Sequence, residues 1–294
     1  MQGVRVTSRG QLRLAEQCRV IVDNDWAGDP DGLVALAHHL LSPTNRVVAI
    51  TSSFLDPVFG ETDSTAARGA VMAQELVDLV GGPARPLVHS GAERALGGTS
   101  AASAAIVAEA RRDDALPLFL VCAGPLTNVA AALEAAPDIA GRLTLVWVGG
   151  ALTADAPEYN RDTDPEAAEL VLARPDLDVW QFPLETYRRC AYSVAELEQD
   201  LAGSGRIGRW LWDRFLELPL PDWIRLGGVW PLGDSPPVLV TALSDESSTW
   251  TETTAGGAVR RVYTDVDTRL LFGDLLARLR RHDRREASGW PEGR

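Results

Sequence analysis

The 294-residue chain contains no lysine, so all 28 of its basic residues are arginines. Schiff-base enzymes need a lysine amine, and P-loop nucleotide hydrolases need a lysine that reaches the phosphates of the nucleotide. The composition therefore excludes both classes. With 41 acidic residues the formal net charge is −13, and such a field repels phosphate backbones and anionic membranes. We expect neither a nucleic-acid partner nor a membrane partner.

Cysteines and long apolar runs are also scarce. Cys18, Cys122 and Cys190 are odd in number and lack CxxC spacing, which is typical of reduced, buried thiols. No apolar run is long enough to span a bilayer. Residues 1–16 are polar and lack the apolar core of a signal peptide. These features lead us to expect a cytoplasmic protein.

Segments of strand length alternate with segments of helix length through the first half of the chain. A buried strand is predicted over residues 18–22, followed by a helix and a second strand. The further predicted elements are helices over 33–41, 64–80, 101–111 and 125–134, and strands over 46–52, 116–122 and 143–148. This alternation predicts an α/β fold with a mostly parallel open sheet flanked by helices. Ligands of such sheets bind at the carboxyl ends of the strands, where we expect the active site.

The second half of the chain is richer in predicted helices. These helices cover residues 165–172, 194–201, 207–216 and 268–281, with a short strand over 179–183 and polar strands within 244–264. No segment has the composition of a linker, so we expect a single domain over residues 1–294. Residues 1–16 and 283–294 are predicted to be mobile tails of that domain.

Four aspartates follow the first predicted strand closely. Asp23, Asp25, Asp29 and Asp31 fall within nine positions. Carboxylates at this density repel one another unless protons or a cation neutralise them. Hard oxygen ligands suit calcium or magnesium, whereas a solvated turn with helix-capping aspartates is the alternative. The spacing by itself leaves both interpretations open.

A family resemblance begins in this acidic segment. The aspartate-rich signature of the inosine-uridine-preferring nucleoside hydrolases resembles Val20-Ile21-Val22-Asp23-Asn24-Asp25, followed by Gly28, further aspartates and Val34-Ala35-Leu36. Three later segments are similar to family motifs in the same order, namely Gly124-Pro125-Leu126-Thr127-Asn128, Glu158-Tyr159-Asn160 with Asp164-Pro165-Glu166-Ala167-Ala168, and Gly233-Asp234. One such motif is a weak signal, but four in order over residues 20–234 are specific.

The resemblance implies hydrolysis of the N-glycosidic bond of a ribonucleoside or a related N-riboside, with calcium as the cofactor. It makes Asp25 both a calcium ligand and the general base that activates water. The other implied metal residues are Asp31, Thr127 through its backbone carbonyl, Asp234, and Asp23 as a supporting acidic neighbour. Glu158 and Asn160 are the implied ribose contacts. Assembly into a homo-oligomer, a dimer or a tetramer, is implied in the same way.

The chain departs from the family pattern at several positions. One residue is inserted among the aspartates, so the roles of Asp29 and Asp31 stay open; we place Asp31 on the metal and Asp29 at the substrate. Gly233 stands where the family often has histidine, which removes a candidate acid for the leaving base. This change favours a pyrimidine-type substrate, another acid or a better leaving group. The family's asparagines after the second strand and before Glu158 are absent.

Tryptophans are the remaining candidates for contact with a nucleobase. Trp212, Trp223 and Trp230 offer flat surfaces for stacking, and packing in the core or at a subunit interface is the equal alternative.

Two other functions stay open. Phosphatases of the haloacid dehalogenase type also begin with an Asp-x-Asp motif, but they stabilise the phosphoryl group with a lysine. A calcium-dependent ribose- or nucleoside-binding protein without catalysis fits the same motifs as the hydrolase.

Overall fold

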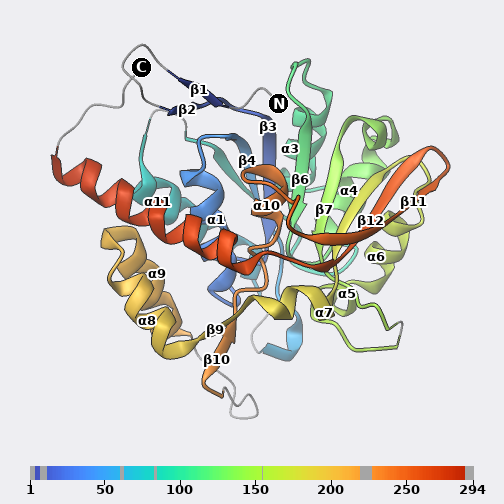
Figure 1. The fold of residues 1–294 in the computed structure, drawn as a ribbon. Coiled ribbons are helices and arrows are strands. Elements are labelled where there is room, and N and C mark those ends of the chain that lie inside the picture. The colour runs from blue at the N-terminus through green and yellow to red at the C-terminus, as the bar shows by residue number, and fades with distance from the viewer. Residues whose placement is uncertain are drawn as a thin grey trace.

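An eight-stranded sheet crosses the middle of the molecule, as the computed structural model shows for residues 4–6, 12–59, 63–82, 85–153, 155–218 and 227–288 (Figure 1). The strand order is β11-β12-β8-β7-β6-β3-β4-β5. Their bounds are β3 Cys18–Asn24, β4 Asn45–Ser52, β5 Leu87–Ser90, β6 Leu118–Cys122, β7 Thr144–Val148, β8 Asp178–Phe182, β11 Thr249–Ala255 and β12 Ala258–Asp265. Only β11 is antiparallel to its neighbour. The predicted mostly parallel α/β sheet is confirmed.

Helices cover both faces of this sheet (Figure 1). Successive residues of β3 point to opposite faces, as strand geometry requires: Val20 and Val22 belong to one apolar core and Ile21 to the other. The first core includes α1 Asp31–Leu41, α2 Thr65–Val80, α8 Val194–Ala202, α9 Gly205–Glu217, α10 Pro237–Thr241 and α11 Thr268–Ser288. The second includes α3 Ala101–Arg111, α4 Thr127–Ala135 and α6 Pro165–Leu172. Burial on both faces explains the continuous apolar runs of the central strands.

Two small antiparallel strand pairs lie outside the main sheet, one at the top and one at the bottom of Figure 1. One pairs β1 Val4–Val6 with β2 Leu12–Leu14, and the other pairs β9 Ala191–Ser193 with β10 Val229–Pro231. The remaining elements are short: α5 Tyr159–Thr163, α7 Leu184–Tyr187, η1 Pro57–Phe59, η2 Pro137–Arg142 and η3 Arg188–Cys190. Within the described ranges, no helix has the length and apolarity needed to cross a membrane.

The structure differs from the predicted elements mainly at their ends. β3 continues through Asp23 and Asn24, so the first aspartate is part of the sheet rather than of the loop. The closing helix runs to Ser288, and residues 283–288 are helical instead of forming a tail. Part of the predicted N-terminal tail forms the β1–β2 hairpin. The predicted core elements otherwise lie within a few residues of the observed ones.

Candidate active site

A cavity of about 400 Å³ opens at the carboxyl ends of the central strands. Ala123 follows β6, Val148 ends β7, and Asp25 follows β3, and all three line this cavity. Ligand sites in proteins commonly enclose about 300–1,000 Å³. The cavity therefore has both the position expected for an open parallel sheet and the size for a nucleoside-sized ligand.

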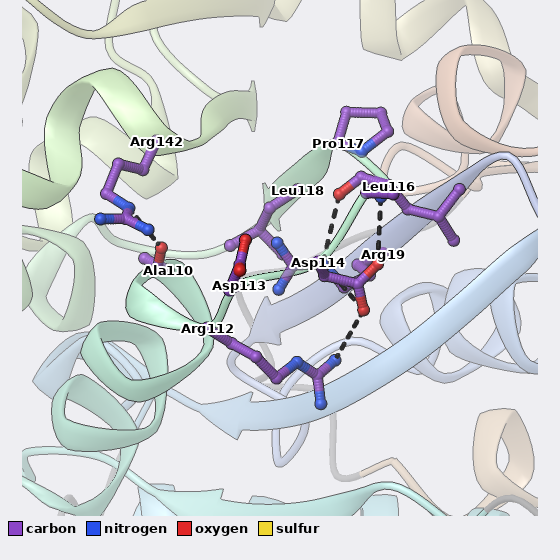
Figure 2. Close-up of a pocket in the computed structure, with 10 residues that line it drawn as sticks. Arg19, Ala110, Arg112, Asp113, Asp114, Leu116, Pro117, Leu118 and Arg142 are labelled. Carbon is purple, nitrogen blue, oxygen red and sulfur yellow. Dashed lines mark hydrogen bonds and ion pairs between the residues drawn. The ribbon is translucent and has the colours of Figure 1, made fainter.

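A second cavity, of about 380 Å³, lies at the opposite, amino-terminal ends of β3, β6 and β7 (Figure 2). Its charged groups are bound to the protein itself. Arg19 donates to the carbonyl oxygens of Glu109 at 2.8 Å and Leu116 at 3.3 Å, and Arg142 donates to the carbonyl of Ala110 at 2.9 Å. Arg112 forms an ion pair with Glu109 at 3.0 Å. These contacts hold the α3–β6 connection against the sheet. Because the arginines of the second cavity are bonded in this way, the first cavity is the candidate site.

The acidic segment and Asp234 are brought together although about 200 positions separate them. Asn24 Nδ2 donates to Asp234 Oδ2 at 2.8 Å, and the Asp234 amide donates to Asp31 Oδ2 at 3.2 Å. Gly32 permits this approach, because a Cβ there would come within 2.6 Å of Asn24 Nδ2 and 3.2 Å of Asp234 Oδ2. Asp25, Asp29, Asp31 and Asp234 all line the cavity.

Negative charge in this cluster has no cationic protein partner. Burial raises the pKa of Asp25 and of Asp31 well above the ordinary value, and repulsion from Asp234 raises both further. Burial likewise raises the pKa of Asp234, to about 7. Within the described residues, no arginine or histidine is among the main causes of these shifts. The cluster therefore needs protons or a bound cation to be stable at neutral pH.

The donor chemistry of the cluster fits a hard divalent cation. Its side-chain groups are carboxylates, with neither thiol nor imidazole among them, and calcium prefers such oxygen ligands. As they stand, no three acidic, histidine or cysteine side chains anywhere in the described ranges converge into a group that could hold a metal ion. The Asp234 amide instead donates to Asp31 Oδ2 at 3.2 Å, and a proton on either carboxyl group would relieve the repulsion between the two. A cation would replace that proton and use the same oxygens.

Asp23 lies beneath the cavity, fully buried in β3. Its carboxylate accepts hydrogen bonds from Thr51 Oγ1 at 2.5 Å, Ser53 Oγ at 2.6 Å and Asn128 Nδ2 at 2.8 Å. These three donors come from β4, from the residue after it and from α4. Asp23 therefore joins three segments that surround Asp25 and does not line the cavity itself.

The two aspartates whose roles the sequence left open have different partners. Asp29 accepts hydrogen bonds from Trp230 Nε1 at both carboxylate oxygens, at 2.9 and 3.0 Å. Asp31 lies instead against Asp234. This arrangement favours Asp31 over Asp29 for a ligand shared with Asp234.

The three tryptophans differ in location. Trp230 lines the cavity, and its ring meets Phe215 edge-on at 5.1 Å. Trp212 stacks on Phe215 at 6.0 Å within the core and does not reach the cavity. Packing is therefore the interpretation that the structure supports for Trp212, while Trp223 lies outside the described residues.

Glu158 and Asn160 also line the cavity, at the start of α5. Glu158 accepts the amide hydrogens of Gly150, Asn160 and Arg161, and the hydroxyl of Tyr187 at 3.0 Å. Asn160 Nδ2 donates to the carbonyl of Val148 at 2.9 Å. Both predicted ribose residues are thus held in fixed orientations by the backbone around them.

Thr127 begins α4, just after the loop that contributes Ala123 to the cavity. Its hydroxyl donates to Asp164 Oδ2 at 2.5 Å. The Thr127 hydroxyl is therefore bonded to Asp164, which caps α6. Only the Thr127 backbone carbonyl, the group that the family resemblance implies, would be available to a ligand.

Several cavity residues were not predicted from the sequence. Tyr159 places its hydroxyl against Asp25 and accepts the Asp56 amide hydrogen at 3.2 Å. Tyr187 packs on Gly233, where an added Cβ would lie 3.0 Å from Tyr187 Cδ2. Arg68 and Arg188 line the outer wall. Tyr187 therefore occupies the space next to position 233, where the family often has histidine; no local motif signals this replacement.

Comparisons with known proteins agree with the geometry. The family model for the inosine-uridine preferring nucleoside hydrolase matches residues 20–284. The pyrimidine-specific ribonucleoside hydrolase RihA of Salmonella typhimurium is 28% identical over 203 residues, which are 61% of this chain and 64% of that protein. The match thus spans less than two thirds of the relative.

Solved structures share the fold at lower sequence identity. The purine-preferring ribonucleoside hydrolase from Gardnerella vaginalis has a TM-score of 0.68 and 22% identity, over 90% of this chain and 99% of that one. The type III effector protein XopQ, complexed with adenosine diphosphate ribose, has a TM-score of 0.61 and 15% identity, over 93% of each chain. The family model matches most of the chain, and the acidic cavity lies at the expected edge of the sheet. The chain therefore belongs to the inosine-uridine preferring nucleoside hydrolase family.

Proposed function

We propose that this protein hydrolyses the N-glycosidic bond of a ribonucleoside, or of a related N-riboside, to ribose and free base. The observation that carries the proposal is the group of buried carboxylates Asp25, Asp31 and Asp234, which line one cavity and form no ion pair with any cationic side chain of the described residues. The family and the hydrolase relatives support the reaction. The effector XopQ is complexed with ADP-ribose, which is a substituted riboside. We therefore include substituted ribosides in the proposed substrate class.

We assign the calcium ligands to Asp25, Asp31, Asp234 and the Thr127 backbone carbonyl. When bound, calcium would supply open coordination positions for a water and the ribose diol and would lower the pKa of that water. A 2′-deoxy substrate lacks half of this diol and is expected to react poorly.

Asp25 is proposed as the general base. Its raised pKa makes it a better proton acceptor once neighbouring charge is neutralised. Tyr159 fixes the orientation of the carboxylate through its hydroxyl. Cleavage develops positive charge on the sugar ring, as in other glycosidases, and the surrounding carboxylates stabilise that charge without a covalent step.

Other residues that line the cavity are proposed to hold the sugar and the base. Glu158 and Asn160 are pre-oriented by backbone contacts and are proposed to contact ribose hydroxyls. Trp230, with its flat ring at the cavity surface, is proposed to contact the base. Gly233 cannot protonate a leaving base, and burial keeps the pKa of Tyr187 far above neutral pH. A pyrimidine nucleoside, or another riboside with a good leaving group, therefore fits best, in line with the pyrimidine-specific relative. A homo-oligomeric state and a cytoplasmic location stay predictions.

The test is release of ribose from a panel of purine and pyrimidine nucleosides with calcium present. Asp25→Asn should abolish release while nucleoside binding persists. Asp78→Asn, which changes an exposed aspartate on α2, is the matched control and should keep full activity. Tight nucleoside binding by the wild-type protein without any ribose release would favour the non-catalytic binding protein instead.

A further inference from the structure

Two arginines line the candidate cavity next to its acidic wall, and both are exposed to solvent. Arg68 lies in the first turns of α2; the next residue, Gly69, packs so closely on the acidic loop that a Cβ there would come within 3.1 Å of the Ala27 amide nitrogen. Arg188 follows Tyr187, whose hydroxyl binds Glu158. Arg68 therefore lies beside the acidic loop, and Arg188 lies beside the contact between Tyr187 and Glu158.

Neither guanidinium is bonded to a carboxylate or a carbonyl of the described residues. Most arginines of the described residues donate to a carboxylate or a carbonyl, as Arg46, Arg174 and Arg261 do. Within the same ranges, the guanidinium groups of Arg68 and Arg188 make no hydrogen bond or ion pair, and the charge of Arg188 helps to lower the pKa of Glu185. Their positive charges and donor groups are available to a ligand in the cavity.

The electrostatics of the cavity make this arrangement unusual. Five carboxylates line it, and the chain carries a net charge of −13, so an anion would be repelled from most of its surface. A planar guanidinium is suited to bind phosphate or carboxylate through two parallel hydrogen bonds. Neutral nucleosides have no group that requires two unpaired arginines.

We infer that the substrate is an anionic riboside, whose phosphate or carboxylate group is bound by Arg68 and Arg188 at the cavity mouth. The inference rests on the proposed function, since it names the substrate class of the same site. The anion is either a phosphate on the sugar or a carboxylate on the base, and both present the oxygens that a guanidinium binds.

Three pyrimidine ribosides distinguish a phosphate on the sugar from a carboxylate on the base as the bound anion. Uridine is neutral, uridine 5′-monophosphate carries the charge on the sugar, and orotidine carries it on the base. We expect kcat/KM for one of the two anionic compounds to exceed that for uridine by about tenfold or more, as charge-assisted hydrogen bonds allow. In the Arg68→Ala/Arg188→Ala variant this ratio should fall toward one. Arg209→Ala removes an exposed arginine of α9 that does not line the cavity, and it should leave the ratio unchanged.

A binding experiment keeps the inference separate from catalysis. Calorimetric titration compares ribose 5-phosphate with ribose, and orotate with uracil, on the wild-type protein and the double variant in the presence of calcium. Arginine-dependent preference for an anion without hydrolysis of any riboside would overturn the proposed function and support the anion site. Hydrolysis of uridine at least as fast as both anionic ribosides, or an anionic preference that the double variant retains, would overturn the inference alone.

Discussion

Removal of calcium is expected to destabilise the protein much more at about pH 8 than at about pH 5.5. Without the cation, burial raises the pKa of Asp234 from its ordinary 3.8 to about 7. A raised carboxyl pKa means that the folded state holds the proton more tightly than the unfolded state. The resulting stability is fully present below the unfolded pKa and is lost as pH rises through the folded pKa, so the metal-free protein weakens between these two conditions.

The size of this loss in folding stability follows from the pKa shift of Asp234. A rise of about three pKa units corresponds to roughly 4 kcal/mol over the whole interval between the two pKa values, and the part of that interval above pH 5.5 accounts for about 2 kcal/mol. For a domain of this size, such a change moves the melting temperature by about 4 °C. Calcium removes the loss at the higher pH, because the cation takes the place of the proton.

Differential scanning fluorimetry with calcium or with a chelator, at both pH values, measures the effect. The calcium-induced rise in Tm should be larger at the higher pH, and Asp234→Asn should reduce it at both. Asp78→Asn should behave like the wild type. An equal calcium-induced rise at both pH values, or none at the higher one, would refute the reasoning.

Three substitutions test other contacts of the site. Asp23→Asn places an amide against three hydrogen-bond donors and should cost about 2–4 kcal/mol of unfolding free energy, measured by urea titration. Trp230→Phe removes the indole donor to both carboxylate oxygens of Asp29 and should raise KM more than it lowers kcat in steady-state kinetics; an unchanged KM would argue against contact between Trp230 and the base. Gly233→His should lower stability and give no purine hydrolysis, because its Cβ meets Tyr187 at 3.0 Å. Purine hydrolysis that appears in Gly233→His with no loss in Tm would contradict the crowding argument.

The fold was largely predictable because its signals are local. Apolar runs of strand length, such as residues 18–22, and helical segments such as 101–111 are defined by neighbouring residues, and parallel strands buried on both faces have no competing pattern. The position of Asp25 followed from the end of one such strand. Errors fell at element ends, where β3 continues through two polar residues because the side chains of neighbouring segments satisfy Asp23.

The geometry of the site was less predictable because its contacts are distant in sequence. Asn24 binds Asp234 across 210 positions, and nothing near either residue indicates the pairing. Trp212 and Trp230 look alike in the sequence, yet one packs in the core and the other faces the cavity. Tyr187 fills space beside Gly233 only because α7 and the β10 segment meet in three dimensions.

Isothermal titration with calcium measures binding at the proposed metal site itself. We expect one calcium ion bound per chain in the wild type at about pH 8, and no measurable binding in the Asp31→Asn and Asp234→Asn variants, with Asp78→Asn unaffected. A folded wild-type protein that binds no calcium, or binding that survives both substitutions, would contradict the proposed metal site.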